Sequence, residues 1–191
     1  YLEDEANIES HEYYYGEASI SHPVEWKKAH VARVMEMAHA TVNNACVVIW
    51  SLGNEAGPGN NFVEAYKALK AFDATRPVQY ERNNDIVDMG SNQYPSIGWT
   101  QGAVTGKYGI KYPFHISEYA HSMGNAVGNL IDYWEAIEST NFFCGGAIWD
   151  WVDQSMYNYE KDGTRYLAYG GNFGDTPNDG QFVMNGIIFG D

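Results

Sequence analysis

Short apolar runs alternate along this chain with stretches whose apolar residues recur at helical spacing. Cys46–Trp50 is the clearest run, because its five residues are all apolar, as a strand buried on both faces requires. Such an alternation is typical of β-α units that build a parallel sheet. The pattern therefore predicts an α/β fold.

The same pattern predicts six strands and at least three helices. The strands are expected at Tyr1–Glu9, Cys46–Trp50, Val78–Glu81, Ile86–Tyr94, Tyr112–Glu118 and Gly145–Trp151. The helices are expected from Pro23 to about Val42, from Phe62 to Phe72 and from Asn125 to Glu138. The remainder, from Asp153 on, is rich in Gly, Asp, Asn and Tyr and is typical of loop.

Six strands in this order fit most of a (β/α)₈ TIM barrel, although a whole barrel usually needs about 250 residues. With 191 residues, either two strands are missing or the sheet is open and doubly wound. No glycine-rich phosphate loop supports the doubly wound alternative. The barrel is favoured because a polar or aromatic residue stands at or near the carboxyl end of each strand, where barrel active sites form. These residues are Glu9, Glu55, Glu81, Tyr94, Glu118 and Trp149.

The composition excludes several classes of function. A net charge of −14 without a cluster of Lys and Arg argues against a nucleic-acid partner. No stretch of eighteen apolar residues is present, so we expect no membrane span. No signal peptide is visible and we expect a cytoplasmic location, with a periplasmic one left open because the chain opens at Tyr1 without a Met. Cys46 and Cys144 lie in or beside apolar runs and are expected to be buried free thiols.

Two predicted strands end in a carboxylate, at Glu55 and at Glu118. Each glutamate alone could be a partly exposed cap of the following helix. Two of them at the ends of strands in one parallel sheet point to chemistry, because a buried charge needs a partner or a purpose. Glycoside hydrolysis needs such a pair, one carboxylic acid that protonates the leaving oxygen and one carboxylate that attacks the anomeric carbon in retaining enzymes.

Glu9 and His11 form a third candidate group. In an extended segment, residues two apart share a face, so both side chains could reach one cation. A carboxylate-rich site with water suits Mg²⁺. An ordinary hydrogen-bonded histidine is the alternative.

Several segments together resemble the large bacterial β-galactosidases of glycoside hydrolase family 2, in the family's order and over nearly the whole chain. The matching segments are Asp4–Glu9, Ile49–Glu55, Arg76–Glu81, Glu118–Asn125, Trp149–Ser155 and Tyr169–Asp179. The dipeptide Asn54-Glu55 is shared by many barrel glycosidases, whereas the last three segments are specific to the β-galactosidase branch.

The resemblance implies a role for particular residues. Glu55 falls at the acid/base and Glu118 at the nucleophile of a retaining β-galactosidase that hydrolyses terminal β-D-galactosides such as lactose. The implied sugar contacts are Asn54, Tyr94, His121 and the aromatic platform Trp149. The implied ligands are Glu9, His11 and Glu55 for Mg²⁺, and Asn185 with the backbone carbonyl of Phe182 for Na⁺.

The resemblance also implies that residues 1–191 are part of the catalytic TIM-barrel domain, from about strand three to strand eight, without the flanking β-sandwich domains. The full-length enzyme is expected to be a homo-oligomer. Three alternatives stay open at this point: a non-catalytic fragment that needs the missing barrel strands, a sugar-binding or association module, and a related β-glycosidase such as a β-glucuronidase.

Overall fold

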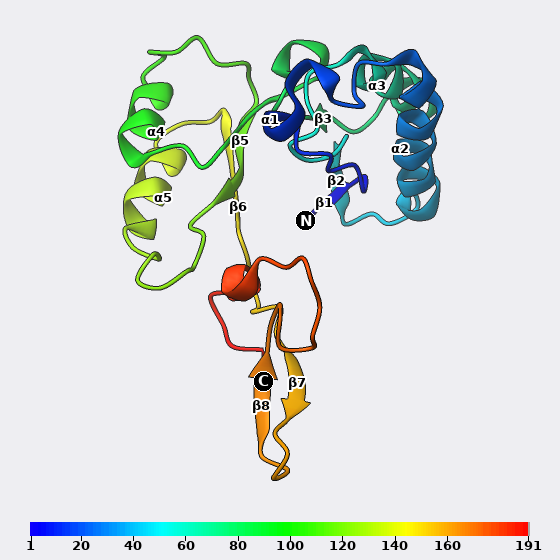
Figure 1. Cartoon of the computed structure of the whole chain (residues 1–191). Helices are drawn as coiled ribbons and strands as arrows, with labels where there is room; N and C mark the ends of the chain where they lie inside the picture. The colour runs from blue at the N-terminus through cyan, green and yellow to red at the C-terminus, as the bar shows by residue number, and fades with distance from the viewer. Residues whose placement is uncertain (191) are drawn as a thin grey trace. The chain divides into compact units, whose positions relative to one another are not determined.

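A computed structural model describes residues 1–190, apart from the side chain of Tyr13. The chain divides into two compact units (Figure 1). Unit 1 comprises Tyr1–Ser91 with Gly109–His115, and unit 2 comprises Asn92–Tyr108 with the chain from Ile116 onward.

Unit 1 is built on a parallel three-stranded sheet in the order β1 (Leu2–Glu5), β2 (Val47–Ser51), β3 (Val78–Gln79). Asp4 pairs with Trp50, and Trp50 with Val78. Helix α2 (Lys27–Thr41) connects β1 to β2, and helix α3 (Asn60–Phe72) connects β2 to β3; the two helices pack against each other (Figure 1). The predicted β-α alternation is confirmed in this unit.

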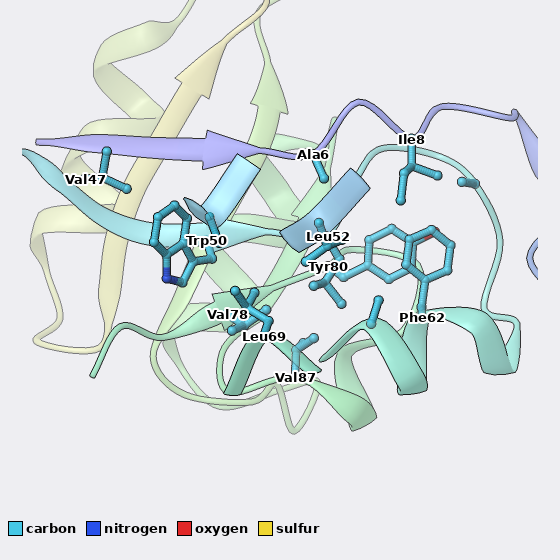
Figure 2. Close-up of a cluster of buried hydrophobic side chains, with 14 residues drawn as sticks. Ala6, Ile8, Val47, Trp50, Leu52, Phe62, Leu69, Val78, Tyr80 and Val87 are labelled. Atoms are coloured by element: carbon cyan, nitrogen blue, oxygen red, sulfur yellow. The ribbon is translucent and has the colours of Figure 1, made fainter. Parts of the chain in front are cut away.

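The core of unit 1 lies between the sheet and the helices α2 and α3. Figure 2 shows Trp50 and Leu52 of the β2 segment, Phe62 and Leu69 of α3, and Tyr80 after β3, all fully buried. The rings of Phe62 and Tyr80 stack with their centroids 4.1 Å apart. This packing fixes the carboxyl ends of β2 and β3, because each strand end carries one of the core residues.

Unit 2 contains most of a second three-stranded sheet in the order β4 (Gly90–Gln93), β5 (Phe114–Tyr119), β6 (Phe143–Ile148). Helices α4 (Ile97–Val104) and α5 (Leu130–Glu138) pack against each other, and α5 also contacts β6. Helix α4 was not predicted; its start is capped by Ser96, whose Oγ accepts from the backbone N–H of Trp99 at 3.1 Å. Helix α5 begins later than Asn125, after Asn129, which adopts left-handed φ of 59°.

The expectation of loop from Asp153 on is wrong for residues 156–168. Strands β7 (Met156–Tyr159) and β8 (Arg165–Ala168) pair antiparallel as a hairpin. Its turn carries Asp162-Gly163, with Gly163 at φ 87° and the Asp162 carboxylate accepting the N–H of Thr164 at 2.9 Å. Asp-Gly between two short runs is a standard hairpin signal, and it was present in the sequence.

Short helices complete the fold. They are α1 (Glu12–Tyr15), η1 (Gly16–Ala18), η2 (Val24–Trp26), η3 (Asn84–Ile86) and η4 (Gly180–Val183). The helix expected from Pro23 thus begins as a 3₁₀ turn before it becomes α2. Cys46 and Cys144 form no disulfide within the described residues, as predicted, but both are exposed, so the expectation that they are buried is wrong. Within residues 1–190 no sheet closes into a barrel, and no helix has the length and apolar character needed to cross a membrane.

Candidate active site

Glu9, His11 and Glu55 come together in unit 1, beyond the carboxyl ends of β1 and β2. His11 Nε2 lies 3.1 Å from Glu9 Oε1 and 3.4 Å from Glu55 Oε2. One potential ligand atom from each of the three residues lies within 4.8 Å of the other two. Two carboxylates and an imidazole at this spacing form a donor set that fits a divalent cation.

The backbone around these residues is held by hydrogen bonds between the two loops. The N–H of Asn54 donates to the carbonyl of Ile8 at 2.8 Å, and the N–H of Glu12 donates to the carbonyl of Glu55 at 2.8 Å. Gly53 allows this close approach, since a Cβ there would lie 2.6 Å from the Ile8 carbonyl oxygen, and its φ is 143°. The chain between Glu9 and Glu12 is therefore fastened to the segment that carries Glu55.

Asn54 points to the same cluster. Its Nδ2 donates to Glu9 Oε1 at 3.0 Å, and the residue is 9% exposed. A cavity of about 540 Å³ adjoins the cluster. Its lining residues are Glu9, Ser10, His11, Tyr14, Tyr15, Ala18, Ser19 and Ile20. The ring of Tyr14 is parallel to that of His11, with centroids 5.7 Å apart.

Glu81 and Arg82 join the cluster from the end of β3. Glu81 Oε1 accepts the backbone N–H of Glu55 at 2.9 Å and lies 3.1 Å from Arg82 Nε, while Arg82 NH2 lies 3.2 Å from Glu55 Oε1. Burial raises the pKa of the Glu81 carboxyl to about 7, against the lowering effect of the Glu55 N–H and the Arg82 charge. Glu81 was predicted at a strand end, but Arg82 was missed, and no local motif marks it.

Tyr94 and Glu118 come together in unit 2. Glu118 lies within β5, and its carbonyl accepts the backbone N–H of Tyr94 at 2.7 Å. Tyr94 follows β4 directly and has a left-handed φ of 49°. The Tyr94 ring meets the ring of His121 edge-on, with centroids 6.0 Å apart.

His121, Trp149, Phe182 and Asn185 form the rest of this group. With its amide in the orientation that satisfies both ends, Asn185 Oδ1 accepts from Trp149 Nε1 at 2.9 Å and from His121 Nε2 at 3.2 Å. Asn185 Nδ2 then donates to the carbonyl of Val183 at 3.1 Å. The Phe182 ring lies 5.1 Å from that of His121. The buried amide of Asn185 thus joins His121 and Trp149, which lie far from it in the sequence.

A chain with these two groups matches one family along its entire length. The family model described as glycosyl hydrolases family 2, TIM barrel domain, matches residues 1–191. The chain belongs to this family. The expected TIM-barrel domain is confirmed, as is the resemblance to family 2 β-galactosidases.

Characterised relatives are similar over the full length of the chain. "Beta-galactosidase 2" of Enterobacter cloacae is 41% identical over 207 residues, which cover 100% of this chain and 20% of that protein. The β-galactosidase of Priestia megaterium is 42% identical over 201 residues, which cover 100% of this chain and 19% of that protein. The chain spans about a fifth of the length of these relatives.

Solved structures of the family share the fold. The crystal structure of Ruminococcus gnavus β-glucuronidase matches with a TM-score of 0.54 at 16% identity, over 86% of this chain and 33% of that chain. A β-glucuronidase from Faecalibacterium prausnitzii matches with a TM-score of 0.53 at 17% identity, over 85% of this chain and 32% of that chain. At this level of identity the likeness concerns the fold alone.

In this family 2 domain, the structure gathers the residues implied by the resemblance into two groups. Unit 1 holds Glu9, His11, Asn54 and Glu55, and unit 2 holds Tyr94, Glu118, His121, Trp149, Phe182 and Asn185. Glu9, His11 and Glu55 follow β1 and β2, and Tyr94, Glu118 and Trp149 lie at the carboxyl ends of β4, β5 and β6, where catalytic residues of a TIM barrel lie. Phe182 and Asn185 come from η4 and the loop that follows it. The roles of the individual residues remain predictions.

Proposed function

We propose that this chain supplies the two catalytic carboxylates of a retaining β-galactosidase that hydrolyses terminal β-D-galactosides such as lactose. The observation that carries the proposal is the cluster of Glu55 with Glu9 and His11, in a chain that is 41% identical over its full length to a protein named β-galactosidase. A carboxylate held beside a cation site at a strand end is placed for acid/base work.

In the proposed reaction, the Glu118 carboxylate attacks the anomeric carbon of galactose. The bond from that carbon to the leaving oxygen breaks, and the Glu55 carboxyl gives its proton to that oxygen. The products of this step are a free alcohol or sugar and a galactosyl ester of Glu118. Glu55, now ionised, takes a proton from water, whose oxygen attacks the anomeric carbon and releases the Glu118 carboxylate. Two inversions leave the configuration retained.

Glu9, His11 and Glu55 would hold Mg²⁺ in this proposal, since their ligand atoms already lie within 4.8 Å of one another. When bound, Mg²⁺ supplies a fixed positive charge that favours the ionised form of Glu55. Asn54, by donating to Glu9 Oε1, orients one ligand of that site.

The group in unit 2 is proposed to bind the sugar. Trp149 is 37% exposed, so its indole face is available to the apolar C–H face of galactose. Tyr94 and His121 would contact hydroxyl groups beside the nucleophile. Phe182, through its carbonyl, and Asn185 are proposed ligands of Na⁺. Because Asn185 Oδ1 already accepts two hydrogen bonds, the ion would compete with Trp149 and His121, and no step of the reaction is assigned to it.

For the whole protein we propose that residues 1–191 contribute about strands three to eight of the catalytic barrel. Flanking β-sandwich domains, homo-oligomeric assembly and a cytoplasmic location complete the proposal. The support is the length of the relatives, which are about five times as long as this chain.

The test is hydrolysis of an aryl β-galactoside and an aryl β-glucuronide with Mg²⁺ and Na⁺ present, by the 191-residue chain and by the protein in its full natural length. Azide then assigns the two glutamates. Azide attack on the galactosyl ester of a Glu55→Ala variant gives the β-galactosyl azide, whereas direct attack in a Glu118→Ala variant gives the α-anomer.

Glu64→Gln is the matched control, because Glu64 pairs with Lys67 on α3 and has no proposed role. It should keep full activity. Preferred hydrolysis of the glucuronide would replace the galactosidase proposal by a β-glucuronidase. Absence of turnover in the full-length protein would make the domain a non-catalytic module.

A further inference from the structure

Arg82 connects two carboxylates of unit 1 that differ in their surroundings. Its NH2 lies 3.2 Å from Glu55 Oε1, and its Nε lies 3.1 Å from Glu81 Oε1. The side chain of Glu81 is 3% exposed and that of Glu55 is 15% exposed, whereas that of Arg82 is 34% exposed. Arg82 thus reaches from the rim of the site to the buried carboxylate of Glu81 and the mostly buried carboxylate of Glu55.

The three residues close a ring of contacts. Glu81 Oε1 accepts the backbone N–H of Glu55 at 2.9 Å, so it holds the main chain of Glu55 while Arg82 holds its side chain. A guanidinium is planar with its donors in a fixed fork, so fixing one edge on a buried carboxylate determines where the other donors point. Glu81 therefore anchors Arg82, and Arg82 orients Glu55.

The two oxygens of Glu55 face different partners as a result. Oε1 contacts Arg82, whereas Oε2 lies 3.4 Å from His11 Nε2 on the side of the candidate cation site. The charged and titratable side chains near Glu55 include Glu9 and His11, which follow β1, and Glu81 with Arg82 at the end of β3. Of these four, Arg82 alone carries a permanent positive charge.

We propose that Arg82 is a positioning residue for Glu55, which holds Oε1, leaves Oε2 to the side of Glu9 and His11, and shares the charge of the carboxylate with a divalent cation bound there. The role of Arg82 as a positioning residue rests on the proposed function of Glu55 as acid/base. The sharing of the Glu55 charge between Arg82 and a cation is independent of that function, because it follows from the contact between Arg82 and Glu55.

The first consequence concerns the leaving group. When a proton donor is no longer oriented correctly, only those reactions are slowed in which the leaving oxygen must be protonated. In the full-length protein, Arg82→Met should lower kcat/KM for lactose by about tenfold or more. The kcat/KM for a dinitrophenyl β-galactoside, whose leaving group needs no proton, should stay within about twofold of that of the unaltered protein. A general loss of structure would slow both substrates alike.

The second consequence concerns cation affinity, measured without turnover. Mn²⁺ serves as the probe because bound and free ions are distinguished by electron paramagnetic resonance. Removing a positive charge that contacts a ligand carboxylate relieves repulsion of the cation, so Arg82→Met should bind Mn²⁺ about three- to tenfold more tightly.

Arg82→Lys separates charge from geometry. The ammonium keeps the charge but lacks the fork, so Mn²⁺ affinity should stay within about twofold while lactose hydrolysis falls. Lys67→Met is the matched control, since it removes one positive charge that pairs with Glu64 on α3. It should change neither measurement. Arg82→Gln serves in place of Arg82→Met if the latter does not fold.

An equal loss on both substrates, or unchanged or weaker Mn²⁺ binding in a folded Arg82→Met protein, would overturn the inference. If the unaltered protein hydrolyses no galactoside, the proposed function fails by itself. The Mn²⁺ titration then decides whether Arg82 shares the charge of Glu55.

Discussion

Replacing Glu81 by Gln should remove a specific pH dependence from the stability of unit 1. Burial raises the pKa of this carboxyl from 4.5 to about 7. The folded state therefore binds one proton more than the unfolded state between these two values. The contribution of Glu81 to the unfolding free energy is therefore fully present below pH 4.5, and it is lost as the pH rises from 4.5 through about 7. A difference of roughly 2.5 pH units at about 1.4 kcal/mol each corresponds to about 3.5 kcal/mol.

Glutamine keeps an oxygen that can accept the N–H of Glu55 but does not titrate. Urea unfolding of both proteins from pH 4 to 8 gives the difference in unfolding free energy at each pH, in which the titration of other groups largely cancels. Relative to Glu81→Gln, the unaltered protein should lose about 3.5 kcal/mol of unfolding free energy between pH 4.5 and 7 and change little above that. A difference that is flat, or that rises with pH, would show that Glu81 is ionised at low cost and would refute the reasoning.

Three further perturbations test the core and the support of the site. Phe62→Ala should lower the unfolding free energy by about 3–5 kcal/mol, measured by urea unfolding, because a fully buried ring stacked on Tyr80 is removed. Asp73→Asn should lower the unfolding free energy by about 3 kcal/mol at pH 7 in the same assay, because Arg76 NH1, which lies 2.6 Å from Asp73 Oδ2, would lose its charged partner. Burial raises the pKa of the Asp73 carboxyl, but hydrogen bonds hold this pKa well below its usual value. The difference between the two proteins should therefore shrink in acid, where Asp73 becomes protonated. Gly53→Ala should weaken Mn²⁺ binding by about tenfold or more in a titration, since the new Cβ would lie 2.6 Å from the carbonyl oxygen of Ile8 and displace the segment before Glu55. Unchanged Mn²⁺ binding would show that the loop accommodates the Cβ without displacing Glu55.

The strands and helices of unit 1 were predictable because their signals are local. The run Cys46–Trp50 gave β2 to within one residue, and the apolar spacing from Phe62 to Phe72 gave α3. Such patterns need only the nearest neighbours in the chain and a buried face. The hairpin β7–β8 has a local signal as well, the Asp162-Gly163 turn, but the tyrosines and glycines around that turn favour a prediction of loop.

The sequence by itself determined the family and the candidate residues: carboxylates at strand ends, a Glu9–His11 pair and the segments shared with family 2. Only the tertiary structure decided how these groups meet. Arg82 contacts Glu55 across 27 positions, and Asn185 joins His121 across 64. Neither contact has a local signature, since the first joins segments that follow two neighbouring parallel strands and the second joins the segment after β5 to the loop after η4. The buried setting of Glu81, and with it a pKa near 7, follows from packing that no single segment specifies.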